Sequence, residues 1–190
     1  MRPKRVNVKI AIPFVGEISG EWEPDDAERR AAWELYVELA TRISVVPLHA
    51  GEGSVREALT SMYSLFATIR DILKRYGPDV ASAGGPDRVS FGVLAVTVLN
   101  NALRPTLSKW HPRLAVWEST LVPGRPLIDH ENAWPEIDAL RADLEALRLV
   151  LRQMADVLGD VAGAADLIRV SETVPLPMAK RPEPRGQADQ

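Results

Sequence analysis

The polar side chains with the clearest potential for chemistry lie on one predicted helix, at about residues 90–119. They are Asn100, Asn101, Arg104, Lys109, His111 and Arg113. Arg104 and His111 have six residues between them, and both lie on the predicted helix. In the simplest interpretation these side chains form a solvated polar face, and the two asparagines hydrogen-bond carbonyl groups that Pro105 leaves without a donor. In the alternative interpretation Arg104 and His111 act together, with Asn101 as a further candidate.

The spacing of Arg104 and His111 resembles the Arg-x(4–6)-His signature of the HEPN superfamily. This superfamily comprises helical ribonucleases and nucleotide-modifying proteins of bacterial conflict systems. In its members the arginine and the histidine cluster near the dimer interface of the helical bundle and act on RNA phosphodiesters. The resemblance covers one short motif, and it implies that Arg104 and His111 would be the catalytic residues of a ribonuclease. Both side chains would then have to converge in a polar cleft or across a dimer interface.

Other patterns that carry chemistry are missing from the sequence, so we expect neither a metal site nor a cofactor. Glu-x-x-His pairs do not occur, and two of the three histidines, His49 and His130, fall in predicted loops. The run Asp129-His130-Glu131 stands just before a predicted helix, where capping is the better interpretation. Residues 51–54 lack the lysine of a phosphate-binding loop and indicate a loop that ends in a helix N-cap. The sequence also lacks a Gly-x-Ser-x-Gly nucleophile motif.

The composition indicates one ordinary globular domain. Of the 190 residues, 46% are hydrophobic and 26% are charged, and the formal net charge is −3. This charge gives no general attraction to nucleic acid or to anionic membranes. Without cysteine, the chain cannot use disulfides or thiolate chemistry. No targeting signal is evident, and the longest uncharged run, residues 89–103, is too short to span a bilayer as a helix. We therefore expect a cytoplasmic protein, and its bias toward arginine suggests a bacterial source.

The N-terminal segment, at about residues 3–23, predicts a β-hairpin. Val6, Val8, Ile10 and Ile12 alternate with polar or small residues, which is the period of a half-buried strand. Basic residues dominate this strand and glutamates dominate residues 17–23, an arrangement that favours antiparallel pairing. Because an isolated hairpin is marginal in water, this one must pack on the helices or gain strands from a partner.

Four amphipathic helices are predicted at about residues 24–44, 54–76, 90–119 and 135–159, with loops at 79–88 and 121–133. Ser54 and Glu57 form the pattern of a capping box at the start of the second helix. Pro105 and Pro112 lie inside the third helix and predict a kink, or a break into two helices at Arg104-Pro105. Residues 163–170 are a possible extension of the fourth helix.

The fourth predicted helix carries the clearest apolar stripe in the chain. Its members follow one another at alternating steps of three and four residues: Ile137, Leu140, Leu144, Leu147, Leu151, Met154, Leu158 and Val161. This spacing places them on one face of a helix, as a narrow seam that another helix must cover. The covering helix can belong to the same chain or to a second subunit.

Together these patterns predict a mainly α protein, an antiparallel four-helix bundle with a small N-terminal β-hairpin and a disordered C-terminal tail. Residues 1–170 form the single helical-bundle domain, and residues 171–190 form the tail, which is rich in proline and polar residues.

The sequence favours a non-enzymatic bacterial interaction or accessory module that acts through oligomerisation or a protein partner. The free edge of the hairpin and the long apolar seam are its two candidate contact surfaces. The alternative is the HEPN-like ribonuclease with Arg104 and His111, and only in that case do we expect a nucleic-acid partner. A small-ligand site near Pro105 is a third possibility, which a cavity at that kink would support.

Overall fold

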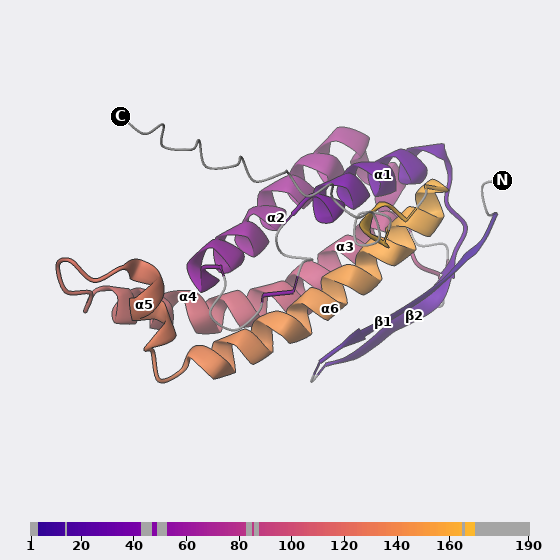
Figure 1. Cartoon of the computed structure of the whole chain (residues 1–190). Helices are drawn as coiled ribbons and strands as arrows, with labels where there is room; N and C mark the ends of the chain where they lie inside the picture. The colour runs from indigo at the N-terminus through magenta and orange to yellow at the C-terminus, as the bar shows by residue number, and fades with distance from the viewer. Residues whose placement is uncertain are drawn as a thin grey trace, which may run out of the picture.

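The computed structural model describes residues 4–13, 15–42, 47–48, 53–82, 85, 88–164 and 166–169. The chain is mainly helical, with one two-stranded antiparallel sheet at its N-terminus (Figure 1). This agrees with the predicted fold class, whereas the antiparallel four-helix arrangement stays a prediction. The predicted disordered tail at 171–190 lies outside the described residues. Within the described residues, no helix combines the length and apolar character needed to cross a membrane.

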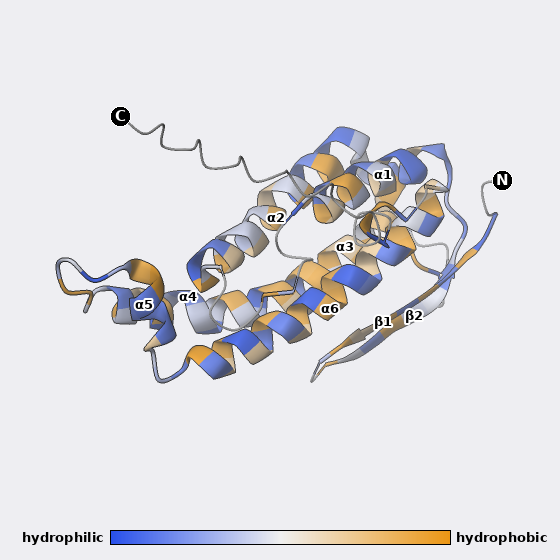
Figure 2. Cartoon of the chain, viewed as in Figure 1, coloured by the Kyte–Doolittle hydropathy of each residue, from blue (hydrophilic) through white to orange (hydrophobic). Residues whose placement is uncertain are grey.

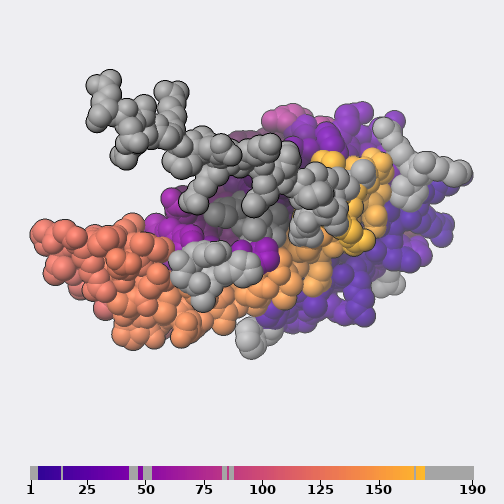
Figure 3. Space-filling model, in the orientation of Figure 1, coloured from indigo at the N-terminus to yellow at the C-terminus, as the bar shows by residue number. Residues whose placement is uncertain are grey.

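The hairpin consists of β1 (Val6–Ile12) and β2 (Gly16–Trp22), paired from Val6↔Trp22 to Ile12↔Gly16. The four apolar residues of β1 are buried and its alternate residues are exposed, as the period of two predicted. The buried face of β1 contacts helix α6 (Ile137–Ala162), and the surfaces of the hairpin and α6 adjoin in the space-filling view (Figure 3). This packing supplies the support that two strands alone lack.

Helix α1 (Asp26–Ala40) begins with a full capping box that the sequence analysis did not single out. The Asp25 carboxylate accepts a hydrogen bond from the Glu28 backbone N–H at 2.8 Å, and the Glu28 carboxylate accepts one from the Asp25 N–H at 3.2 Å. Glu28 is 6% exposed and also accepts a hydrogen bond from the backbone N–H of Phe91 at 3.2 Å. The side chain therefore links the start of α1 to the start of α3 (Phe91–Val98).

The buried Glu28 carboxyl should make stability depend on pH. Burial raises its pKa, and the hydrogen bonds that it accepts offset this only in part. Because the pKa of Glu28 is raised in the folded state, its contribution to the free energy of unfolding is highest below its pKa in the unfolded chain. This contribution falls as the pH rises through its pKa in the folded state. We expect the difference in unfolding free energy, wild type minus Glu28→Gln, to shrink from pH 4 to pH 7 in urea titrations. The same titration of a variant at the exposed Glu57, Glu57→Gln, is the control, and a difference that grows with pH would contradict this assignment.

Helix α2 (Val55–Tyr76) starts at its predicted N-cap, Ser54, and ends at Gly77, whose φ is +73°. The predicted capping box is only half present, because the Ser54 side chain accepts from the Glu57 N–H but Glu57 does not return the bond. Part of the loop predicted at 79–88 belongs instead to a short 3₁₀ turn, η2 (Gly77–Ala81).

The third predicted helix continues through Pro105 by way of one wider turn. Helix α3 leads into a π-helical turn, η3 (Leu99–Leu103), and then into α4 (Arg104–Glu118). The Arg104 N–H donates to the carbonyl of Leu99, five residues back. Proline has no N–H and its ring crowds the carbonyl four residues earlier, so a wider turn accommodates it without breaking the helix. Of the two predicted alternatives, a kink or a break at Arg104-Pro105, the break into two separate helices is therefore wrong.

Two boundaries near the C-terminal helix also differ from the predictions. The loop predicted at 121–133 contains a short helix, α5 (Leu127–Asn132), at one end of the molecule (Figure 1). Its two buried polar residues, His130 and Glu131, have partners in α4 and α2. Gly163 is left-handed (φ +68°) and ends α6, so the helix does not extend through 163–170 as we considered.

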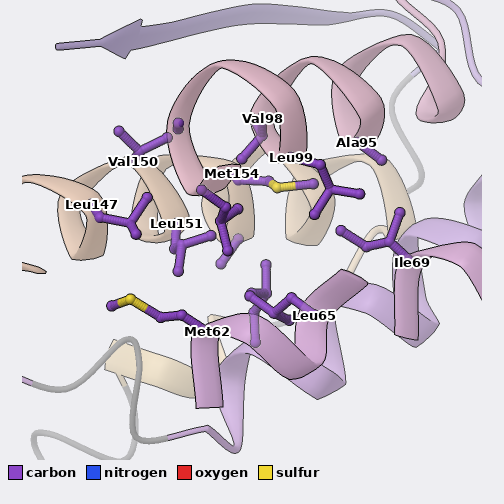
Figure 4. Close-up of a cluster of buried hydrophobic side chains, with 14 of the residues drawn as sticks. Met62, Leu65, Ile69, Ala95, Val98, Leu99, Leu147, Val150, Leu151 and Met154 are labelled. Carbon is purple, nitrogen blue, oxygen red and sulfur yellow. The ribbon is translucent and has the colours of Figure 1, made fainter. Parts of the chain in front are cut away.

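The apolar stripe of α6 belongs to the core and is covered, as its spacing predicted. All eight of its residues are buried, and exposed polar residues occupy the other face of the helix (Figure 2). Helices α1, α2 and α4 and strand β1 of the same chain contact α6, and Figure 4 shows its side chains packed among residues of α2 and α3. The stripe is thus covered within one chain, which removes it as a candidate surface between subunits.

Candidate functional site

The two residues of the predicted Arg–His pair lie in one cavity. Arg104 and His111 are two helical turns apart on α4 and line a cavity of about 540 Å³ between α4 and α2, which we call the α2–α4 groove. The groove is lined by Tyr63, Phe66, Arg70, Arg104, Leu107, Ser108, His111 and Pro112. Of these residues, only Arg104 and His111 are candidates for chemistry from the sequence.

Arg104 contributes a guanidinium to the groove, and the residue is exposed to solvent. Its Nε donates to the side-chain oxygen of Asn100 at 3.2 Å, and the guanidinium carbon lies 5.3 Å from the centre of the Phe66 ring. Arg70 follows Phe66 by one turn of α2 and is exposed. In the described part of the chain neither arginine forms an ion pair. By contrast, Lys109 of α4 pairs with Asp143 in α6, and Arg113 pairs with Glu136, the residue just before α6. Positive charge in the groove is therefore left unbalanced.

His111 is held by its neighbours at the other end of the groove. Arg56 donates to its Nδ1 at 3.0 Å and pairs with the Glu118 carboxylate through two bonds of 2.8 and 2.7 Å. Burial and the nearby Arg56 charge lower the pKa of His111, against the opposing effect of Glu118, so the ring is neutral at pH 7. Since Nδ1 accepts a hydrogen bond, the proton belongs on Nε2, which is shut off from solvent and has no hydrogen-bond partner among the described residues. In this conformation neither ring nitrogen faces a ligand.

Aromatic rings form a wall of the groove beside these charges. Tyr63 is 61% exposed, and its ring centre lies 6.0 Å from that of Phe66 and 5.6 Å from that of His111. Exposed tyrosine next to arginine is a combination enriched at the contact centres of protein interfaces. A signal for this wall exists in the sequence, since Tyr63, Phe66 and Arg70 recur at steps of three and four on α2.

The third candidate, Asn101, lies in a different cavity. It is exposed in η3 and lines a cavity of about 320 Å³ between η3, α4, α6 and the tip of the hairpin. Pro105, Lys109 and Asp143 line the same cavity. Arg104 and His111 are not among its lining residues, so the structure does not bring Asn101 together with the Arg–His pair.

Of the two remaining histidines, the structure describes His130, which forms no metal site with its described neighbours. His49 lies outside the described residues. The His130 ring stacks on Trp117, with ring centres 4.7 Å apart, and its Nε2 lies 2.9 Å from the Trp117 carbonyl. No group of three or more metal-ligating side chains occurs in the part of the chain that the structure describes.

Glu131 caps a helix, but not the helix that the sequence indicated. Its carboxylate is fully buried and accepts hydrogen bonds from the Ser54 hydroxyl at 2.8 Å and the Val55 N–H at 3.1 Å. It thus occupies the N-terminus of α2 and not that of α6, which follows it in the chain. By fixing the start of α2, this contact also positions Arg56, the residue that holds His111.

The chain matches no family model, no curated protein and no solved structure. Assignments for the α2–α4 groove consequently depend on its own geometry and charge.

Proposed function

We propose that this protein is a non-enzymatic interaction module that contacts a protein partner through the α2–α4 groove. The observation that supports this proposal is that Arg70 and Arg104, which have no carboxylate partner among the described residues, line one groove with the exposed ring of Tyr63. Arginine and tyrosine together supply a charged fork and a rigid apolar surface, the side chains that contribute most to binding in known interfaces. A bacterial source, a cytoplasmic location and the antiparallel four-helix arrangement belong to the same proposal.

Two surfaces considered from the sequence are less suitable for a partner. The stripe of α6 is covered by the chain itself. The hairpin edges are partly occupied, because the Ala11 N–H donates to the Gln153 side chain at 2.9 Å and the Val89 N–H donates to the Glu21 carbonyl at 2.9 Å. An added strand would have to displace these bonds or pair with only part of an edge. The α2–α4 groove requires no such displacement.

A double charge reversal tests the proposal. In cells that carry the gene, we expect affinity capture with Arg70→Glu/Arg104→Glu to recover at least about tenfold less of the specific partner than wild type does, because like or reversed charges across an interface are strongly unfavourable. Both side chains are exposed, so the variant should fold, which circular dichroism checks. Arg125→Gln, at an exposed position outside the groove, is the control for nonspecific charge effects. Light scattering of the purified protein separates a second copy of the chain from a different partner.

The HEPN-like ribonuclease is the second candidate, favoured by one observation: Arg104 and His111 line the same groove. For catalysis His111 would have to exchange a proton with RNA, yet Arg56 occupies its Nδ1 and its Nε2 is buried. Side chains would therefore have to rearrange before the ring could act. This alternative requires the purified protein to cleave single-stranded RNA and the variants Arg104→Ala and His111→Ala to lose that activity.

A further inference from the structure

We propose that the α2–α4 groove recognises a short acidic peptide segment that carries one aromatic side chain between its carboxylates. This inference depends on the proposed function, since it names the chemistry of the partner at the same site. The occupant follows from three properties of the groove: where its unbalanced charge lies, what its apolar wall can accept, and how far its positive charge extends.

Two arginines bring positive charge to the groove. Arg104 lies over the Phe66 ring at 5.3 Å, and Arg70, one helical turn after Phe66, lines the same cavity. Three other basic side chains of α2 and α4 are paired: Arg56 with Glu118, Lys109 with Asp143, and Arg113 with Glu136. A planar guanidinium binds a carboxylate through two parallel hydrogen bonds, so Arg70 and Arg104 match two carboxylates on either side of a central residue.

The wall between the charges is apolar and partly open. Tyr63, Phe66, Leu107 and Pro112 line it, and Tyr63 is 61% exposed. An aromatic side chain of the partner can stack against Tyr63 or Phe66, and such ring pairs are stabilised beyond the area that they bury. The cavity volume of about 540 Å³ holds a few side chains, not a folded element.

The extent of the charge favours a peptide over a nucleic acid. Nucleic-acid binding depends on many phosphate contacts, each releasing counterions. Among the described residues, two arginines line the groove, and neither has a carboxylate partner there. One end of the groove is formed by the neutral His111, and the whole chain has a net charge of −3. A segment with two or three carboxylates is matched to this groove, whereas an extended phosphate backbone is not.

Nuclear magnetic resonance titration of the full chain with short peptides tests the inference. The probe is acetyl-Glu-Glu-Phe-Glu-Glu-amide, followed through the side-chain Nε–H signals of Arg70 and Arg104. We expect saturable shifts of both signals with a dissociation constant of roughly 1 mM or below. Binding should weaken at least about tenfold for the glutamine peptide Gln-Gln-Phe-Gln-Gln, and also for Glu-Glu-Ala-Glu-Glu, because each lacks one of the two recognised features. Raising the salt concentration should weaken binding by the acidic peptide as well.

Matched protein variants complete the test. Arg104→Gln should weaken binding of the acidic aromatic peptide at least about tenfold, and Arg125→Gln should leave it unchanged. Equal affinity for the glutamine peptide, or an absence of saturable shifts, would overturn the inference. Tighter binding of adenosine monophosphate than of the peptide would also overturn it and would assign the groove to a phosphate ligand. If no peptide binds but Arg70→Glu/Arg104→Glu still abolishes capture of the partner, only this inference is wrong. If the double variant captures the partner as well as wild type does, the proposed function is wrong.

Discussion

We expect Glu131→Ala to lower the free energy of unfolding by about 3 kcal/mol. The Glu131 carboxylate is 0% exposed and accepts from the Ser54 hydroxyl and from the Val55 N–H. Alanine leaves the buried Val55 N–H and the half-buried Ser54 hydroxyl at the positive end of a 22-residue helix without this acceptor and its negative charge. Equilibrium unfolding in urea, followed by circular dichroism, measures the loss.

Two variants separate the capping role of Glu131 from a general effect of removing charge. Glu131→Gln preserves the shape and one acceptor oxygen, so its loss should be smaller than that of alanine. Glu57→Ala removes an exposed glutamate from the first turn of the same helix and should change stability by no more than about 0.5 kcal/mol. Equal losses for Glu131→Ala and Glu57→Ala would show that the buried carboxylate does not cap α2.

The second large effect is expected in the stripe of α6. Leu151 is 1% exposed and lies on the side of α6 toward Met62 and Leu65 of α2 (Figure 4). Truncation to alanine removes buried apolar contacts and leaves a cavity in a close-packed core, so Leu151→Ala should cost about 3 kcal/mol.

Leu149, on the same helix, provides a matched control for this substitution. It is 46% exposed, so Leu149→Ala deletes the same atoms with little loss of burial and should cost less than about 1 kcal/mol. Both variants are compared by urea unfolding. Similar losses at the two positions would mean that α6 does not present this face to the core.

The elements of this fold could be predicted where their signal is local. The alternation of β1 and the three-and-four spacing along α2 and α6 depend only on which face is buried, and the structure confirms these segments. The end of α2 at Gly77 could likewise be predicted from the sequence, because a C-cap with positive φ favours glycine.

Features that depend on distant partners could not be predicted. Glu131 caps a helix that starts 76 residues before it, and no local pattern distinguishes this carboxylate from an ordinary capping residue beside its own helix. Helix α5 is short, and its buried residues gain their partners only when α2 and α4 lie next to it. The full capping box at Asp25 also has a local signal, a glutamate three residues later, but from the sequence these acidic residues were interpreted only as favourable charge near the start of a helix.

Only two of the residues that line the candidate site were predicted from the sequence as chemically active. Arg104 and His111 share a helix face because seven positions correspond to about two turns, whereas Tyr63 and Arg70 join them only through the packing of α2 against α4. Asn101 would share the face of Arg104 in a regular α-helix. The π-helical turn between them changes their angular offset, and Asn101 lines the other cavity.

The most direct test of the account is quantitative capture of the partner by wild type, Arg70→Glu/Arg104→Glu and Arg125→Gln, each expressed at the same level in cells that carry the gene. Mass spectrometry then counts the specific partner recovered with each protein. The groove hypothesis predicts recovery by wild type and Arg125→Gln alike, and a reduction of at least about tenfold with the double variant. Equal recovery with all three proteins would contradict it.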